Sequence, residues 1–177
     1  MVKDIQFTYL KQNNRRYTFE MPKVKKWVIE NIIGENILNL FAGKTQIFNQ
    51  KEIKEVRIDI DENVNPDYCM DAFDYVLLAI DQKLIFDTII LDPPYSYRKS
   101  MEKYGGRIVS KFRKVKDELP KLCKLGTKII TFGYQSVSMG EKRGFKVKHI
   151  CIISHGGAYH DTIATIESCI FKLEVFS

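Results

Sequence analysis

The stretch FDTIILDPPY, residues 86–95, decides the fold. Its first six residues are mostly apolar and predict a short buried strand over 86–91. Two consecutive prolines then end that strand abruptly, because proline fixes φ and has no backbone N–H to continue a ladder. Chemistry-bearing residues therefore stand directly at the end of a buried strand.

The same alternation of strand and helix continues on both sides of this stretch. Strands are predicted at 37–41, 55–60 and 128–132, and helices after Pro22, after Asp71 and across 107–125. Two long strands, 145–153 and 162–173, are joined through Gly156 and Gly157 as a closing hairpin. This order predicts an α/β, Rossmann-like sandwich with a mostly parallel sheet closed by an antiparallel C-terminal hairpin.

No repeat, low-complexity tract or linker divides the 177 residues, so we expect a single domain over 1–177. Residues 5–10 and 16–20 alternate enough to predict an N-terminal β-hairpin extension over 1–21. No apolar run is long enough to span a bilayer, and the start of the chain lacks the apolar stretch of a signal peptide. Four separated cysteines indicate reduced thiols. We expect a cytoplasmic protein without a membrane partner and without a metal site.

The net charge of +6 is unevenly distributed along the chain. Residues 1–28 hold 7 Lys/Arg against 2 Asp/Glu, residues 29–97 hold 5 against 13, and residues 98–128 hold 11 against 3. Two basic segments therefore flank an acidic middle. This pattern is typical either of a solvated surface or of a rim that contacts phosphates around a site whose acids have another role.

The turn Asp92-Pro93-Pro94-Tyr95 joins three kinds of group within four residues. Asp92 offers a carboxylate, the prolines hold a backbone carbonyl rigidly, and Tyr95 offers an aromatic face. This set suits a planar group that bears an NH2, because two acceptors take its hydrogens and a ring stacks on its face.

Two further strand ends carry candidate binding residues. Gly43 follows the strand at 37–41 and allows a ligand to approach the backbone closely. Asp59 ends the next strand sixteen residues later, where a carboxylate can accept both hydrogens of a ribose diol. Each signal is weak alone.

In this order the motifs resemble those of class I S-adenosylmethionine-dependent methyltransferases that act on exocyclic amines, particularly adenine-N6 DNA methyltransferases. The resemblance covers residues 22–175, and Asp92 to Tyr95 match the catalytic tetrapeptide of the family. It implies that S-adenosyl-L-methionine is the cofactor. The implied cofactor-binding residues are Asn39, Phe41, Ala42, Gly43, Asp59, Asp71, Ala72 and Phe73. Asn39 and Thr45 stand where the family usually has an acid and a second glycine.

The resemblance implies methyl transfer to adenine N6 in DNA. Asp92 and the Pro93 carbonyl would accept both N–H bonds of the amine, and Tyr95 would stack on the base. Basic residues near the turn and the N-terminus are candidates for contacts with nucleic-acid phosphates: Arg15, Arg16, Arg98, Lys99, Lys103 and Arg107. The chain leaves little room for a target-recognition domain, so a protein partner for target recognition is a further expectation.

Several alternatives stay open. RNA is a second substrate polymer, and guanine N2 or cytosine N4 are other exocyclic amines. Protein glutamine methylation ranks lower, because that family usually has Asn in place of Asp92. A non-catalytic nucleic-acid-binding module on the same fold is the alternative of a different class, which the residues at Asn39 and Thr45 support and the intact turn at Asp92 opposes.

Overall fold

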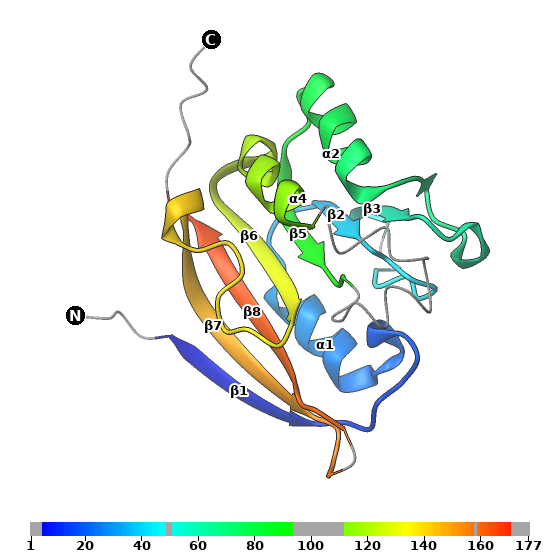
Figure 1. The fold of residues 1–177 in the computed structure, drawn as a ribbon, viewed down its shortest axis with the longest axis vertical. Coiled ribbons are helices and arrows are strands. Elements are labelled where there is room, and N and C mark those ends of the chain that lie inside the picture. Colours follow the sequence, from blue (N-terminus) through cyan, green and yellow to red (C-terminus); the bar gives the residue numbers. More distant parts are fainter. Residues whose placement is uncertain (1–4, 49–50, 94–111, 158, 171–177) are drawn as a thin grey trace.

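A single mixed sheet organises the computed structural model, which describes residues 5–48, 51–93, 112–157 and 159–170 (Figure 1). The sheet order is β1-β7-β8-β6-β5-β2-β3-β4. The strands are β1 (Gln6–Lys11), β2 (Asn36–Leu40), β3 (Lys54–Asp59), β4 (Tyr68–Cys69), β5 (Phe86–Leu91), β6 (Cys123–Gly133), β7 (Phe145–Ser154) and β8 (Thr162–Cys169).

Within this sheet, only β8 runs against its neighbours. Both of its pairings, with β6 and with β7, are antiparallel, and all other pairings among the described strands are parallel. The predicted fold class is therefore confirmed: an α/β, Rossmann-like sheet, mostly parallel, with a C-terminal antiparallel hairpin of β7 and β8. The parallel strands place their carboxyl ends along one common edge.

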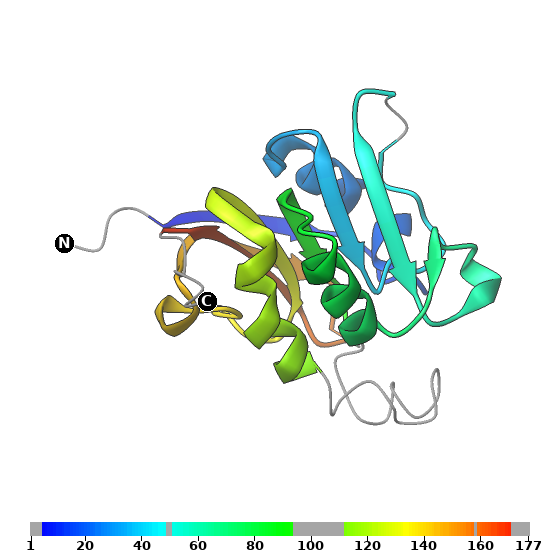
Figure 2. The same cartoon turned by 90° about the horizontal axis from the view of Figure 1, so that it is seen from above.

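Helices cover both faces of the sheet (Figure 2). On one face, α1 (Pro22–Asn31) buries Val24, Trp27 and Val28 against alternate strand residues such as Ile90 and Ile130. On the other face, α2 (Ala72–Asp81) and α4 (Phe112–Glu118) pack on the intervening residues of the same strands. This division follows from the strand period of two, which sends successive side chains to opposite faces.

Local sequence sets the helix limits. Pro22 occupies the first turn of α1, where its missing N–H costs nothing. Asp71 caps α2 by accepting a hydrogen bond from the Phe73 N–H at 2.9 Å. After α4, Pro120 lies in a 3-10 helix, Leu119–Leu122, so the basic helical stretch is divided where proline predicts. The prediction of helix as far as residue 125 is wrong, because β6 already begins at Cys123.

The predicted N-terminal hairpin is wrong. β1 pairs in parallel with β7, and the segment expected as its partner contains a short 3-10 helix, Thr18–Glu20. The physical reason is burial: Phe19 is 2% exposed and packs edge-on against Phe132, with ring centroids 5.6 Å apart. This contact draws the segment into the core, while β1 satisfies its backbone on the edge of β7. No helix among the described residues combines the length and apolar character needed to cross a membrane.

Candidate active site at the carboxyl edge of the sheet

The ends of three adjacent strands meet at one point of the carboxyl edge. Leu40, the last residue of β2, is in register with Ile58 of β3 and with Leu91 of β5. The Asp92 N–H then donates to the Leu40 carbonyl at 3.4 Å. The fold thus brings together the three strand ends that the sequence singled out.

The loop after β2 turns sharply, and a hydrogen bond to the end of β3 holds this turn in place. Phe41 and Gly43 both have positive φ, 65° and 59°. The Gly43 N–H donates to Asp59 Oδ2 at 2.8 Å. A Cβ at position 43 would lie 2.9 Å from Cδ1 of Tyr17, so the ring of Tyr17 occupies the space that a side chain would need. Glycine is therefore required here by both conformation and packing.

Asp59 is a buried carboxylate that joins two turns. It is 4% exposed, and its Oδ1 accepts a hydrogen bond from the Asp61 N–H at 3.0 Å while Oδ2 holds Gly43. A carboxylate oxygen has two lone-pair sites, so each oxygen keeps capacity for a further donor. The sequence anticipated that Gly43 and Asp59 belong together, and the structure places them in direct contact.

Arg57 is a residue of this region that sequence reasoning missed. Its guanidinium donates to the Gly43 carbonyl at 2.7 Å and to the Asn65 carbonyl at 2.9 Å. Arg57 therefore holds both the loop that contains Gly43 and the turn after β3 that contains Asn65. An arginine inside the strand predicted at 55–60 was the available signal, since a charge that becomes buried in a sheet requires partners.

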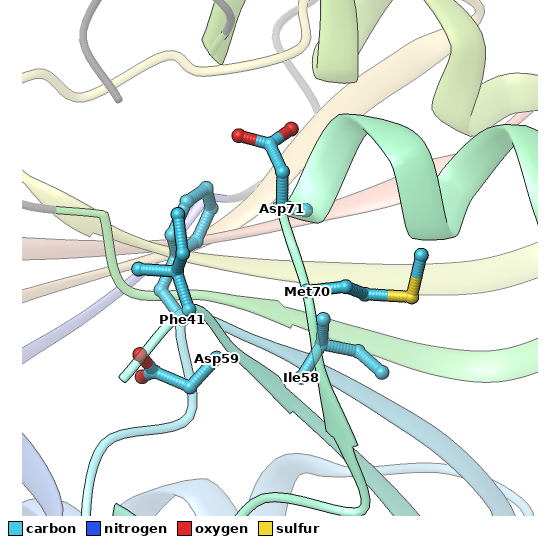
Figure 3. A pocket seen from close by; sticks show the side chains of 7 residues that line it. Phe41, Ile58, Asp59, Met70 and Asp71 are labelled. Atoms are coloured by element: carbon cyan, nitrogen blue, oxygen red, sulfur yellow. The ribbon is translucent and has the colours of Figure 1, made fainter. Parts of the chain in front are cut away.

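A small pocket opens between the β2 loop, the end of β3 and the start of α2 (Figure 3). Its lining comprises Phe41, Ile58, Asp59, Ile60, Met70, Asp71 and Ala72. Four of these are predicted cofactor residues, namely Phe41, Asp59, Asp71 and Ala72. Predicted Ala42, Gly43 and Phe73 lie beside the pocket in the same segments. The apolar lining residues Ile58, Ile60 and Met70 were not predicted. Ile58 is fully buried in the core, and Figure 3 shows the side chains of Ile58 and Met70 directed away from the carboxylates of Asp59 and Asp71.

Asn39 has a different environment from the other predicted cofactor residues. It is fully buried and is not part of the pocket lining. Its Nδ2 donates to Glu55 Oε1 at 2.8 Å, and Glu55 Oε2 accepts from the Ile47 and Phe48 N–H groups. Burial raises the pKa of Glu55, and these hydrogen bonds only partly offset it. An acid at position 39 would set two carboxylates side by side, which explains why an amide stands there.

The predicted catalytic turn is only partly described. Asp92 is half-buried and Pro93 is buried at the end of β5. Pro94 and Tyr95 lie outside the described residues, as do Arg98, Lys99, Lys103 and Arg107. Arg15 and Arg16 are exposed beyond the carboxyl end of β1, and the Arg16 guanidinium lies 5.5 Å from the ring centroid of Tyr17. Tyr17 thus lies between Arg16 and Gly43.

The described residues hold no group of His, Cys, Asp or Glu side chains arranged to bind a metal ion. The candidate binding groups among the described residues of this edge are carboxylates, backbone atoms and aromatic rings. This donor set suits an organic ligand with hydroxyl and amino groups.

Comparisons with known proteins identify the fold. The structure is similar to TrmN from Thermus thermophilus, with a TM-score of 0.60, 12% identity, and coverage of 88% of this chain and 50% of that one. It is similar to the N-methyltransferase NodS from Bradyrhizobium japonicum WM9, with a TM-score of 0.59, 11% identity, and coverage of 88% and 98%. It is also similar to SMU.776 in complex with S-adenosylhomocysteine, with a TM-score of 0.57, 15% identity, and coverage of 82% and 48%.

No protein-family model and no curated protein matches the sequence. The chain spans about half the length of several structures that it matches. At these identities the likeness shows the fold alone, which is the Rossmann-like fold of S-adenosylmethionine-dependent methyltransferases.

Proposed function

We propose that the chain is an S-adenosylmethionine-dependent methyltransferase whose acceptor is an exocyclic amine of a nucleobase, with adenine N6 in DNA as the first substrate to test. The observation that carries the proposal is the meeting of Asp92 with the Gly43–Asp59 loop through the Leu40 carbonyl. The Asp92 carboxylate, which could accept hydrogen bonds from an amine, thus follows the strand next to the one that leads into the Gly43 loop, where a nucleoside could bind.

The residues of the pocket fit the cofactor. The positive φ of Phe41 and Gly43 gives the loop after β2 its sharp turn, and this turn sets Phe41 in the lining of the pocket where the cofactor would lie. Asp59 would accept hydrogen bonds from ribose hydroxyls on the lone pairs that Gly43 and Asp61 leave free. Asp71, which shares the pocket lining with Phe41, would hold the adenine. When bound, S-adenosylmethionine supplies an electrophilic methyl group on a sulfonium.

Asp92 would prepare the acceptor amine. The lone pair of an aromatic amine is delocalised into the ring, so the nitrogen is a poor nucleophile. The Asp92 carboxylate and the Pro93 carbonyl would each accept a hydrogen bond from one N–H group of the amine. The nitrogen then moves toward tetrahedral geometry, and its lone pair becomes available for attack. The Asp92 carboxylate would also stabilise the positive charge that develops on nitrogen as the methyl group leaves sulfur, and would accept the proton that the methylated nitrogen then loses.

The test is transfer of a labelled methyl group from S-adenosylmethionine to duplex DNA, single-stranded DNA and total RNA in parallel, followed by digestion to nucleosides. Label in N6-methyladenine from DNA supports the proposal in full. Label in an exocyclic amine from RNA keeps the reaction and changes the polymer. If S-adenosylhomocysteine binds but no polymer is labelled, the nucleic-acid acceptor is wrong. If the chain does not bind S-adenosylhomocysteine at millimolar concentration, it is a non-catalytic module and the proposal fails.

A further inference from the structure

The described residues leave one face of the sheet uncovered at the β1 edge. Phe7 and Tyr9 of β1 are 68% and 65% exposed, and they share this face with Ile152 of β7, which is 37% exposed. The helices on this side, α2 and α4, lie toward β5 and β2, away from β1 (Figure 1). We call Phe7, Tyr9 and Ile152 the aromatic platform.

The exposure of the platform does not result from a poorly packed strand. The alternate side chains of β1 point to the other face, where Thr8 Oγ1 lies 2.8 Å from His149 Nε2 and Leu10 packs against the core. The strand is therefore held firmly by one face and by its pairing with β7. Two large aromatic side chains on the opposite face have no structural role in the described chain.

The platform is continuous with the carboxyl edge of the sheet. Tyr9 is in register with Ile152, Ile152 with Ile163, and Ile163 with Gly133, the last residue of β6. β6 in turn pairs with β5, which leads to Asp92. Four strand spacings of about 4.8 Å place Tyr9 roughly 19 Å from the β5 strand.

A groove occupies the middle of this row. Its lining is Tyr134, Ile152, His160, Asp161 and Ile163. Tyr134 directly follows β6, and its ring meets that of His160 edge-on, with centroids 6.3 Å apart. Aromatic and aliphatic surface thus extends from the β1 edge to the strand beside β5.

The exposed charges around the platform are mostly positive. Lys11 ends β1, Arg15 and Arg16 follow it at the carboxyl edge, and Lys148 lies on β7; all four are exposed. Asp161 is the acid of the groove. An aromatic surface bordered by cations is complementary to a chain that alternates planar rings with phosphates.

We propose that the aromatic platform binds unpaired nucleotides of a single-stranded nucleic acid while the target base lies at Asp92. This inference rests on the proposed function and specifies its substrate. Side chains two residues apart on a strand present separate faces to separate bases, and every base has a face that can stack. Paired bases in a duplex are stacked on one another and offer no such face, so the platform selects single strands or unpaired regions over duplex.

Binding of fluorescein-labelled 12-nucleotide single-stranded DNA, single-stranded RNA and duplex DNA, followed by fluorescence anisotropy, tests the platform without methyl transfer. Phe7→Ala and Tyr9→Ala should each raise the Kd for single strands by about 5- to 100-fold, the range that base–aromatic stacking contributes. The conservative variants Phe7→Tyr and Tyr9→Phe should retain the wild-type Kd. Leu125→Ala removes a side chain that is 70% exposed at the other end of β6, and should leave the Kd unchanged. The single-stranded DNA and RNA arms decide which polymer supplies the nucleotides.

Unchanged Kd values in both alanine variants, or tighter binding of duplex than of single strands, would overturn the inference. So would a dimer that dissociates in the alanine variants without any change in oligonucleotide affinity, because the platform would then join two copies of the chain. Transfer assays separate this inference from the proposed function. The alanine variants should raise KM for the 12-mer and leave it unchanged for adenosine, which cannot span the distance to Tyr9. If the wild type transfers no methyl group but the alanine variants still weaken binding of single strands, only the proposed function is refuted.

Discussion

Asp92 is the residue on which the proposed chemistry depends most directly. Its backbone N–H donates to the Leu40 carbonyl at the end of a fully buried strand, and Asp92→Ala retains this backbone contact. We predict that Asp92→Ala lowers methyl transfer by at least about 100-fold, the usual cost of removing one group that stabilises developing charge. The affinity for S-adenosylhomocysteine, measured by calorimetry, should stay within about twofold of wild type because Asp92 is outside the pocket lining. Turnover close to that of the wild type would refute the role of Asp92.

A comparison of Gly43 with Gly156 separates the cost of a left-handed backbone from the cost of a clash with a neighbouring side chain. Gly43 and Gly156 both have positive φ, 59° and 90°, but only Gly43 has a neighbour within reach of an added Cβ, namely Tyr17 at 2.9 Å. Gly156→Ala should cost about 1 kcal/mol of unfolding free energy, the penalty of a left-handed residue. Gly43→Ala should cost more than this control and should also weaken S-adenosylhomocysteine binding. Urea unfolding and calorimetry measure both effects, and equal losses in the two variants would contradict the packing argument.

Asn39 shows where residue-level prediction ends. Its position before Phe41 and Gly43 indicated a cofactor contact, but its side chain is buried beside Glu55, sixteen residues away. Only the register of β2 with β3 brings these two residues together, and a single sequence does not display that register. Glycines and acids at strand ends were easier to predict, because the loop edge of a parallel sheet gathers them whatever the register.

At the scale of elements, the prediction succeeded where residues such as proline mark the end of a strand clearly. β5 has the predicted limits because an apolar run ends at two prolines. β6 was predicted over 128–132 but begins at Cys123, since Lys124, Leu125 and Gly126 show no alternation. The N-terminal hairpin failed because alternation over five residues equally describes a segment that buries one aromatic side chain, here Phe19. Local pattern does not reveal which distant edge a short strand will join.

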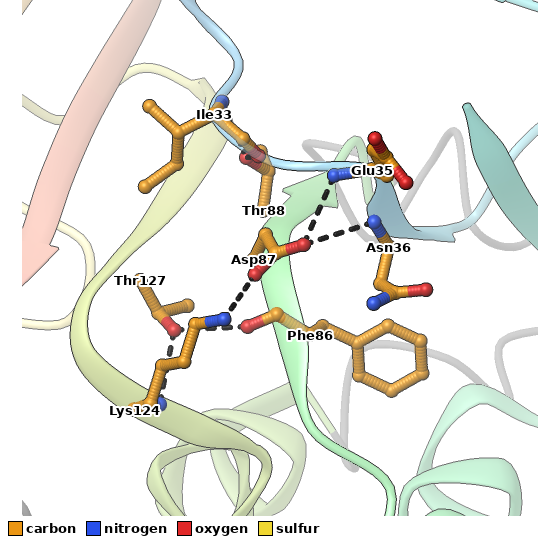
Figure 4. Close-up of polar contacts among 8 residues, drawn as sticks. All are labelled: Ile33, Glu35, Asn36, Phe86, Asp87, Thr88, Lys124 and Thr127. Carbon is orange, nitrogen blue, oxygen red and sulfur yellow. Dashed lines mark hydrogen bonds and ion pairs between the residues drawn. The ribbon is translucent and has the colours of Figure 1, made fainter. Parts of the chain in front are cut away.

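Asp87 ties the amino ends of three elements together (Figure 4). Its Oδ2 accepts hydrogen bonds from the Glu35 and Asn36 N–H groups, both at 3.0 Å, and its Oδ1 pairs with Lys124 at 2.5 Å. Burial by itself would raise the pKa of Asp87, but the hydrogen bond from Lys124 and those from the backbone outweigh it and lower the pKa. The carboxylate thus anchors β2, β5 and β6 at the edge opposite the site.

We predict that Asp87→Ala lowers the unfolding free energy by about 3 kcal/mol, because two backbone N–H groups lose their acceptor. Lys124→Ala should cost less than about 1 kcal/mol, since that side chain is 58% exposed and its pairing is screened by water. Urea unfolding of the two variants measures the difference. Equal costs would mean that the ion pair, rather than the backbone contacts, holds this edge together.

At the scale of the whole molecule, the structure shows where the charged segments of the sequence lie on the sheet. Arg15 and Arg16 from the basic N-terminal segment lie at the carboxyl edge, next to Tyr17 and the Gly43 loop. The acids of the middle segment are divided between that edge, where Asp59 and Asp71 line the pocket, and the amino edge, where Asp87 stabilises the sheet. Two exposed arginines and two pocket carboxylates thus lie along one edge of the sheet, an arrangement that the proposed phosphate-bearing substrate would use.

His149 makes the stability of the whole sheet sensitive to pH. It joins β7 to β1 through Thr8, and its ring lies edge-on to Trp27 of α1, with centroids 5.2 Å apart. Burial, reinforced by the nearby charge of Lys128, lowers the pKa of His149 below its ordinary value of 6.5. The unfolded chain therefore binds a proton more readily than the folded one, so unfolding free energy falls as the pH falls below about 6.5.

We predict that wild-type stability, measured by urea unfolding between pH 7.5 and 5.5, decreases toward acid with a slope of at most about 1.4 kcal/mol per pH unit for this one proton. His149→Gln keeps a polar partner for Thr8 without titrating, and its stability should change less over the same interval. The Asp87 carboxylate does not interfere, because its lowered pKa confines its contribution to pH values below its ordinary 3.8. The raised pKa of Glu55 acts in the opposite direction above 4.5, and because Glu55 is present in both proteins its contribution cancels in the difference between wild type and His149→Gln. Equal slopes in wild type and variant would show that the proton responsible binds elsewhere, and that the contact of β1 with α1 through His149 does not respond to pH.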